Sequence, residues 1–196
     1  MNKITLKNSL YGLIGAIVLG FGIGTWDFVR LGFDSINVFY NALCNITGLS
    51  FSAINFIGGA VMIVACIIID RKQLGIATFI NVVIIALSIK YTGYFYSHFY
   101  TDNFFVKLLI HFVGLNAIAL GAAMIVVCDL GKSQYDAFVF AIASKSKKSF
   151  VFIRYIVDGV ALTLGILLGG SYGIGTIIAI LFIGHLMKQY IKVLKR

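Results

Sequence analysis

Two charged residues lie within one apolar segment of the chain. Asp158 stands about eight residues into an apolar run that begins near residue 150, and Arg154 precedes it by four residues. Residues four apart share one face of a helix. An ionisable group at a helix centre in a bilayer costs roughly 2.5–3.5 kcal/mol on insertion scales. Two interpretations are open: a self-neutralising pair that anchors packing, or a cation-coupling or anion-binding site that faces a cavity.

Polar residues also gather in two similar short stretches, residues 30–43 (RLGFDSINVFYNAL) and residues 129–142 (DLGKSQYDAFVFAI). In the first stretch, Asp34, Asn37 and Asn41 follow a helical spacing. Asp34 or Ser35 can cap such a helix. Each predicted helix, over about 34–45 and 133–144, is too short to cross a membrane.

Each short helix is therefore either interfacial or re-entrant. A re-entrant second helix would carry Asp136 toward the midplane, near Asp158; an interfacial one would leave Asp136 solvated. Single polar residues inside apolar runs more often join helices, at roughly 0.6 kcal/mol each, than line sites. The candidates for binding a substrate or ion are Asp136, Asp158, Asn37, Asn55 and Arg154, the last as counter-ion or anion contact, with Thr78 and Thr176 as polar lining.

The types and spacing of the reactive residues do not predict an enzyme. No Ser/His/Asp arrangement has motif context, and the chain has no Glu. The three cysteines lack metal-ligand spacing, so we expect no metal and no cofactor. The basic residues are not interleaved with aromatic ones, and we expect no nucleic-acid partner.

Composition indicates an all-α membrane protein. The 196 residues are 60% hydrophobic and 12% charged, with a mean hydropathy of +1.00. Soluble domains carry about 25% charged residues. We expect a single integral membrane domain over residues 1–196, with six transmembrane helices at about 9–29, 51–69, 75–97, 104–127, 150–169 and 173–191.

The distribution of basic residues predicts the orientation. With the N-terminus inside, thirteen Lys and Arg residues lie on the inner side and three on the outer side: Arg30, Lys90 and Lys107. By the positive-inside rule, this distribution predicts that both termini lie on the cytoplasmic side of the membrane.

The chain aligns with itself at a shift of 99 residues, reduced to 98 in its last third. The matches include Leu31-Gly32 with Leu130-Gly131, Ser50-Phe51 with Ser149-Phe150, Gly75-Ile76 with Gly173-Ile174, and Lys90 with Lys188. The predicted repeats cover about 8–97 and 104–191. Three spans per repeat require opposite orientations, and inverted repeats are typical of secondary transporters. Duplication also builds channels, scaffolds and accessory proteins.

The second stretch carries a family resemblance. Asp129-Leu130-Gly131-Lys132-Ser133-Gln134-Tyr135-Asp136, then Ser149, Asp158 and Gly175-Thr176-Ile177-Ile178-Ala179, resemble the YczE/YyaS/YitT group of bacterial membrane proteins. In the first half, Thr47-Gly48-Leu49-Ser50-Phe51 and Asn55 fit the pattern, while Arg30 and Asn37 depart from it. The resemblance implies a multi-pass inner-membrane protein of about six spans, and it implies no substrate.

The sequence favours a transporter of an unknown small solute, with its site at the repeat interface. One alternative is a substrate-binding subunit of a vitamin-type uptake complex, which would need an ATPase partner. The other is a non-transporting accessory or regulatory membrane protein. Besides the lipid bilayer, a second copy or a membrane partner could dock on the Gly-rich face of the first span at Gly20 and Gly24, although these glycines could equally serve internal packing.

Overall fold

The computed structural model describes residues 6–195, and the regular structure within this range is helical. The elements are α1 (Leu6–Val29), α2 (Ser35–Thr47), α3 (Phe51–Asp70), the 3₁₀ turn η1 (Arg71–Gln73), α4 (Ile76–Tyr96), α5 (Phe104–Cys128), α6 (Gln134–Ser146), α7 (Phe150–Leu167) and α8 (Ile174–Leu194).

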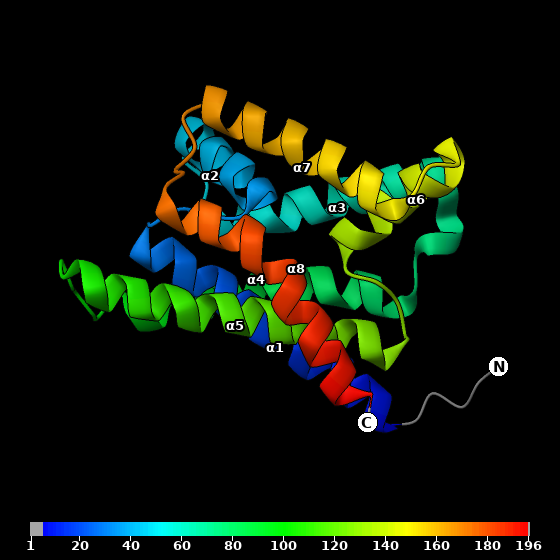
Figure 1. The fold of residues 1–196 in the computed structure, drawn as a ribbon, viewed down its shortest axis with the longest axis horizontal. Helices are drawn as coiled ribbons and strands as arrows, with labels where there is room; N and C mark the ends of the chain where they lie inside the picture. Colours follow the sequence, from blue (N-terminus) through cyan, green and yellow to red (C-terminus); the bar gives the residue numbers. More distant parts are fainter. Residues whose placement is uncertain (1–5, 196) are drawn as a thin grey trace.

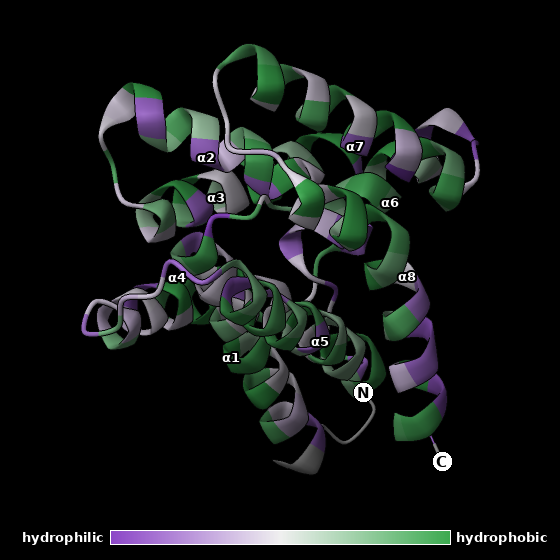
Figure 2. Cartoon of the chain, turned by 60° about the vertical axis from the view of Figure 1, so that its left-hand side comes forward, coloured by the Kyte–Doolittle hydropathy of each residue, from purple (hydrophilic) through white to green (hydrophobic). Residues whose placement is uncertain are grey.

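Six of these helices are long and apolar enough to cross a membrane: α1, α3, α4, α5, α7 and α8. The prediction of six apolar spans and two short helices is confirmed, with the ends of the helices close to the predicted positions. Figure 2 shows the long helices mostly in hydrophobic green, with hydrophilic purple in the connecting segments and along the last turns of α8.

Side chains of the sequence cap both short helices. The carboxylate of Asp34 accepts from the Asn37 N–H at the start of α2, and the Ser133 hydroxyl accepts from the Asp136 N–H at the start of α6. The preceding helices, α1 and α5, are each followed directly by a non-glycine residue with a positive φ. Arg30 and Asp129 take the left-handed conformation, at φ 52° and 54°, and the glycines follow two residues later.

The helices form two layers (Figure 1). In one layer α1 packs between α4 and α5, and α8 runs diagonally along α5. In the other layer α2 packs along α7, and α6 packs along α3. Each short helix therefore packs most closely on a long helix from the other half of the chain.

Two connecting segments run back along the short helices. From α7 the chain passes Asn45, which donates to the Gly169 carbonyl, and then reaches Leu31, whose carbonyl accepts from the Gly175 N–H at 2.9 Å. From α3 the chain passes Ser144, whose hydroxyl donates to the Asp70 carboxylate. It then reaches Leu130, whose carbonyl accepts from the Ala77 N–H at 3.3 Å. Helix α4 thus begins beside the residues that follow α5, and helix α8 begins beside the residues that follow α1.

Glycines bring α1 close to both of its neighbours. A Cβ on Gly20 would lie 2.6 Å from the Ile85 carbonyl oxygen of α4, and one on Gly22 would lie 2.7 Å from the Gly114 carbonyl oxygen of α5. Gly24 likewise meets Thr92 of α4. The close approach that Gly20 and Gly24 permit is made within the chain.

Candidate functional site

A cavity with charged and polar side chains in an otherwise apolar wall lies between the two layers. Its smaller part, which we call the inner chamber, has a volume of about 100 Å³ and is lined by polar residues of α2, α3, α6 and α7 and by apolar residues of α1, α4, α5 and α8. Its vestibule, of about 720 Å³, lies between the end of α5, the start of α6, the first half of α7 and the middle of α8. Asp34, Tyr135, Asp136 and Arg154 line both compartments.

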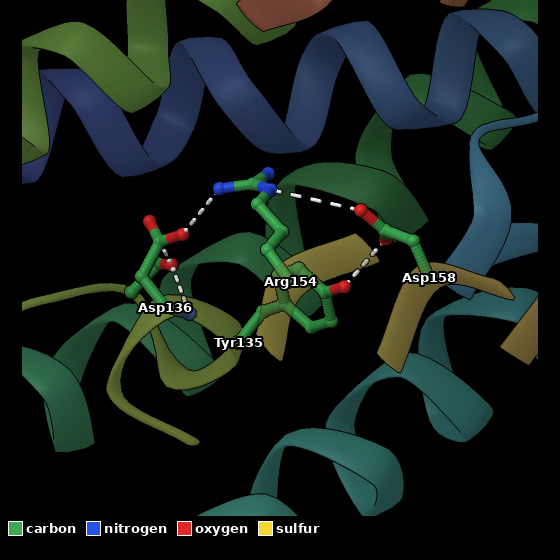
Figure 3. A network of polar contacts seen from close by, with 5 residues as sticks. Tyr135, Asp136, Arg154 and Asp158 are labelled. Carbon is green, nitrogen blue, oxygen red and sulfur yellow. Dashed lines mark hydrogen bonds and ion pairs between the residues drawn. The ribbon is translucent and has the colours of Figure 1, made fainter. Parts of the chain in front are cut away.

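Arg154 is the centre of an ion-pair network (Figure 3). Its guanidinium Nη1 lies 2.9 Å from Asp136 Oδ1, and its Nε lies 3.7 Å from Asp158 Oδ2. The Tyr135 hydroxyl donates to Asp158 at 2.5 Å, and the guanidinium lies over the Tyr135 ring, 5.4 Å from its centre. The start of α6 and the first half of α7 position all four side chains.

A second polar chain reaches the inner chamber from α2 and α3. The Asn37 side-chain amide donates to Asp34 Oδ1 at 2.6 Å, and its oxygen accepts from the Asn55 amide at 3.3 Å. Asn37 and Asn55 are 3% and 4% exposed, so these amides depend on each other and on Asp34 for partners.

The two networks occupy corresponding positions in the chain. Asn37 and Asp136 are 99 residues apart, and so are Asn55 and Arg154. The neutral Asn55–Asn37 hydrogen bond therefore corresponds to the Arg154–Asp136 ion pair. The capping residues Asp34 and Ser133 correspond in the same way, and each bonds the side chain three residues later.

The structure brings five of the seven candidates together at this cavity: Asp136, Asp158, Arg154, Asn37 and Asn55. Thr78 and Thr176 lie elsewhere. The Thr78 hydroxyl donates to the Lys132 carbonyl at 2.9 Å, and the Thr176 hydroxyl accepts from the Gly173 N–H at 3.3 Å. Both threonines fix the first turns of α4 and α8 against neighbouring backbone.

Several lining residues were not among the candidates. Tyr135 and Gln134 line the inner chamber, and Asp129 and Lys132 line the vestibule. Asp34 belongs to the polar stripe of α2, but the sequence suggests only its role as a cap. Their positions in the sequence could have identified both residues once the short helices were placed. Asp34 lies three residues before Asn37, and Tyr135 is next to Asp136.

The lining is acidic although the protein is basic. The chain has seven acidic residues, all Asp, and a net charge of +9. Four of these aspartates line the cavity with two basic residues, so the formal charge of the lining is −2 with every group ionised. Low-dielectric walls focus such a charge, which raises the local concentration of counter-ions.

Burial shifts the titration of two lining groups that lie outside the six spans. It raises the pKa of Asp34 from 3.8 to about 6, against the opposing effect of the Asn37 amide. Burial first, and then the Asp158 carboxylate, raise the pKa of the Tyr135 hydroxyl. Asp34 therefore keeps its proton to a higher pH than a free carboxyl does, and the Tyr135 hydroxyl stays protonated and available as a hydrogen-bond donor.

The apolar helices and the charged cavity between them define the class of protein: an α-helical, multi-pass membrane protein. The chain belongs to a family of unknown function, DUF6198, which matches residues 6–192. It is 24% identical over 192 residues to the uncharacterised protein YyaS of Bacillus subtilis, covering 97% of this chain and 95% of that protein. It is also 25% identical to an uncharacterised protein of Haemophilus influenzae over 126 residues, 64% of this chain and 57% of that one. No solved structure gives a significant match.

Proposed function

We propose that the protein transports a small solute across the bacterial inner membrane, without enzymatic chemistry. The observation that carries this proposal is the cavity itself: paired charges and amides line a chamber between membrane-length helices. Charged groups within membrane proteins are costly and are retained where they face a cavity that solutes or ions enter.

We also propose that the fold consists of two inverted repeats, α1–α4 and α5–α8. Paired contacts support the duplication: α1 with α4 and α5 with α8, α2 with α7 and α6 with α3. The Leu31 and Leu130 carbonyls accept from Gly175 and Ala77, at positions that correspond in the aligned halves. The odd number of spans per repeat supports the inversion, and the distribution of Lys and Arg supports an orientation with both termini cytoplasmic.

The short helices act as re-entrant halves in this proposal. α2 and α6 begin beside the cavity and are directed away from it, with Asn45 and Ser144 near their far ends. The N-terminal end of a helix carries a partial positive charge. Asp34 and Asp136, in or beside the first turns, complement that charge while their side chains face the cavity.

The two halves differ most in how the fourth helix packs on the third, and in this proposal that difference gives the cavity its opening. α3 packs against α4, whereas residues 6–195 show no comparable packing between the corresponding helices α7 and α8. A Cβ on Gly59 would lie 3.1 Å from the Val82 methyl groups, while the corresponding Asp158 and Ile180 both line the vestibule. If the α3–α4 interface opened while the α7–α8 interface closed, the cavity would open to the opposite side of the membrane. This exchange would give alternating access.

Reconstitution into proteoliposomes tests the transport proposal. Uptake would be measured for three labelled probes of different charge: guanidinium, alanine and succinate. We expect protein-dependent uptake of at least one probe, reduced at least tenfold in the Asp136→Asn/Asp158→Asn variant. The matched control is Asp102→Asn, since Asp102 lies in the α4–α5 connection outside the cavity lining.

Uptake of every probe at the protein-free level would contradict the proposal, and so would unchanged uptake in the double variant. Saturable binding without uptake would also contradict it and would favour the solute-capture subunit instead.

A further inference from the structure

The inner chamber presents hydrogen-bond acceptors that have no donor. Gln134 Oε1 is buried and accepts no hydrogen bond within the described part of the chain. The Asn55 oxygen also accepts none from residues 6–195, while its nitrogen donates to Asn37, although this oxygen is not itself buried as Gln134 Oε1 is. Both residues line the chamber. Buried acceptors require donors, so a molecule that fits here supplies N–H or O–H groups.

The orientation of the Asn55 amide follows from the carboxylate of Asp34. A carboxylate only accepts, so Asn37 turns its nitrogen toward Asp34 and its oxygen toward Asn55. Asn55 must then donate through its nitrogen, which leaves its oxygen without a donor from the described residues. Each amide in turn donates through its nitrogen and keeps its oxygen as an acceptor. The two hydrogen bonds, from Asn37 to Asp34 and from Asn55 to Asn37, are 2.6 and 3.3 Å long.

Two donors on the wall, Arg154 and Tyr135, are engaged with carboxylates. Arg154 donates to Asp136 at 2.9 Å and pairs with Asp158 at 3.7 Å, and the Tyr135 hydroxyl donates to Asp158. An anion would have to displace these carboxylates from Arg154. A cation would meet free acceptors in the inner chamber, whose charged lining residues Asp34, Asp136 and Arg154 give it a formal charge of −1.

Aromatic rings complete the environment. Tyr40 and Tyr135 line the chamber with Met62 and Ile85, and the Tyr135 ring already faces the guanidinium of Arg154. The faces of aromatic rings attract cations. A chamber of about 100 Å³ accommodates only a small group, such as a guanidinium or a primary ammonium on a short chain.

We propose that the inner chamber binds the guanidinium or ammonium group of a small organic cation, held by Asn55 Oδ1, Gln134 Oε1 and the Asp34 and Asp136 carboxylates. Arg154 is the resident counter-ion of this site: its guanidinium occupies the carboxylates that the ligand competes for (Figure 3). This inference rests on the proposed transport function and specifies its substrate class.

Binding of labelled guanidinium to the purified protein in detergent tests this proposal through the sign of the response. Gln134→Glu adds a negative charge beside the chamber, and it suits the first helical position of α6 because acids are favourable there. We expect Gln134→Glu to tighten guanidinium binding at least fivefold and Gln134→Leu to weaken it at least fivefold. The control is Gln189→Glu, the same substitution at an exposed site in the C-terminal half of α8.

Arg154→Gln provides a second measurement, because removal of the resident counter-ion tightens guanidinium binding if the site takes cations. Weaker binding in Gln134→Glu, weaker binding in Arg154→Gln, or no saturable guanidinium binding by the wild type would overturn the cation assignment. Asp136-dependent uptake of succinate alone would overturn it too, yet would leave the transport function standing.

Discussion

At the residue scale, the cavity depends on side chains that neutralise one another. Arg154 lies between Asp136 and Asp158, and Asp34 holds the amide chain of Asn37 and Asn55. Removal of one member of a buried ion pair strands a charge, while a hydrogen-bonded set of ions is tolerated. The network is therefore tolerated without a ligand. In the proposed mechanism, its carboxylates exchange their contacts with Arg154 for contacts with the ligand.

Asp34 gives the fold a predictable pH dependence. Its pKa rises from 3.8 to about 6 on folding, so the folded state binds more protons than the unfolded state between these values. This carboxyl therefore lowers stability as pH rises from about 4 to about 6. Asp34→Asn keeps a capping side chain and removes the titration.

We expect the melting temperature of Asp34→Asn, relative to the wild type, to increase from pH 4 to pH 7. Thermal unfolding of the purified protein measures the difference, with Asp102→Asn as the control. A difference that stays constant or decreases over this range would show that Asp34 is not held in a raised-pKa environment.

At this scale the sequence was informative where a charged residue occurs in or beside an apolar segment. Asp136, Asp158 and Arg154 were identifiable because apolar surroundings make an ionisable group conspicuous. Thr78 and Thr176 looked equally suitable, but a hydroxyl in the first turn of a helix can bond nearby backbone instead of a ligand. Gln134 carried no signal, because its unpaired oxygen is a property of packing.

At the element scale, glycines set the spacing between α1 and α4. Gly20→Ala would place a methyl group 2.6 Å from backbone oxygen of α4, where the neighbour cannot move cheaply. We expect a loss of about 1–3 kcal/mol in unfolding free energy. The control is Gly93→Ala in α4, whose added Cβ meets nothing within 4 Å, and which we expect to be neutral or slightly stabilising.

Denaturant titration of both variants measures these effects. Equal stability of Gly20→Ala and Gly93→Ala would mean that the α1–α4 contact is looser than the structure describes.

The long helices were predictable because a membrane span needs a long apolar run, and each run ends where charged or turn residues begin. The paths of the connecting segments 168–173 and 71–75 were not predictable from the sequence. They depend on contacts with α2 and α6, which lie far away in the chain. Local sequence patterns contain no information on such pairing, so the sequence left interfacial and re-entrant placement equally open.

At the scale of the whole molecule, the contact between the two layers is closed in one half of the chain and open in the other. The α3–α4 interface is packed and the corresponding α7–α8 interface is open, with the vestibule between them. In the proposed cycle, opening of α3–α4 is required for solute to cross. A bond across that interface would therefore stop transport.

We expect a disulfide between Gly59→Cys and Val82→Cys to abolish uptake in proteoliposomes and reduction to restore it. The added Cβ of residue 59 lies 3.1 Å from the Val82 methyl carbons, which places the two thiols within bonding reach. Native Cys44, Cys66 and Cys128 would be replaced by alanine, and each single cysteine serves as a control. Unchanged uptake after complete cross-linking would contradict the alternating-access cycle.

Water access to the vestibule from one side of the membrane is the most direct test of a solute pathway. Ile183→Cys places a thiol on α8 where it lines both compartments, and Leu181→Cys places one on the same helix outside the cavity lining, at a site 65% exposed. A membrane-impermeant thiol reagent would be applied to oriented vesicles in the cysteine-free background. We expect position 183 to react from the side that bears the chain termini and position 181 to remain unlabelled. Labelling of neither position, or equal labelling of both, would contradict a water-filled vestibule leading to the Arg154 network.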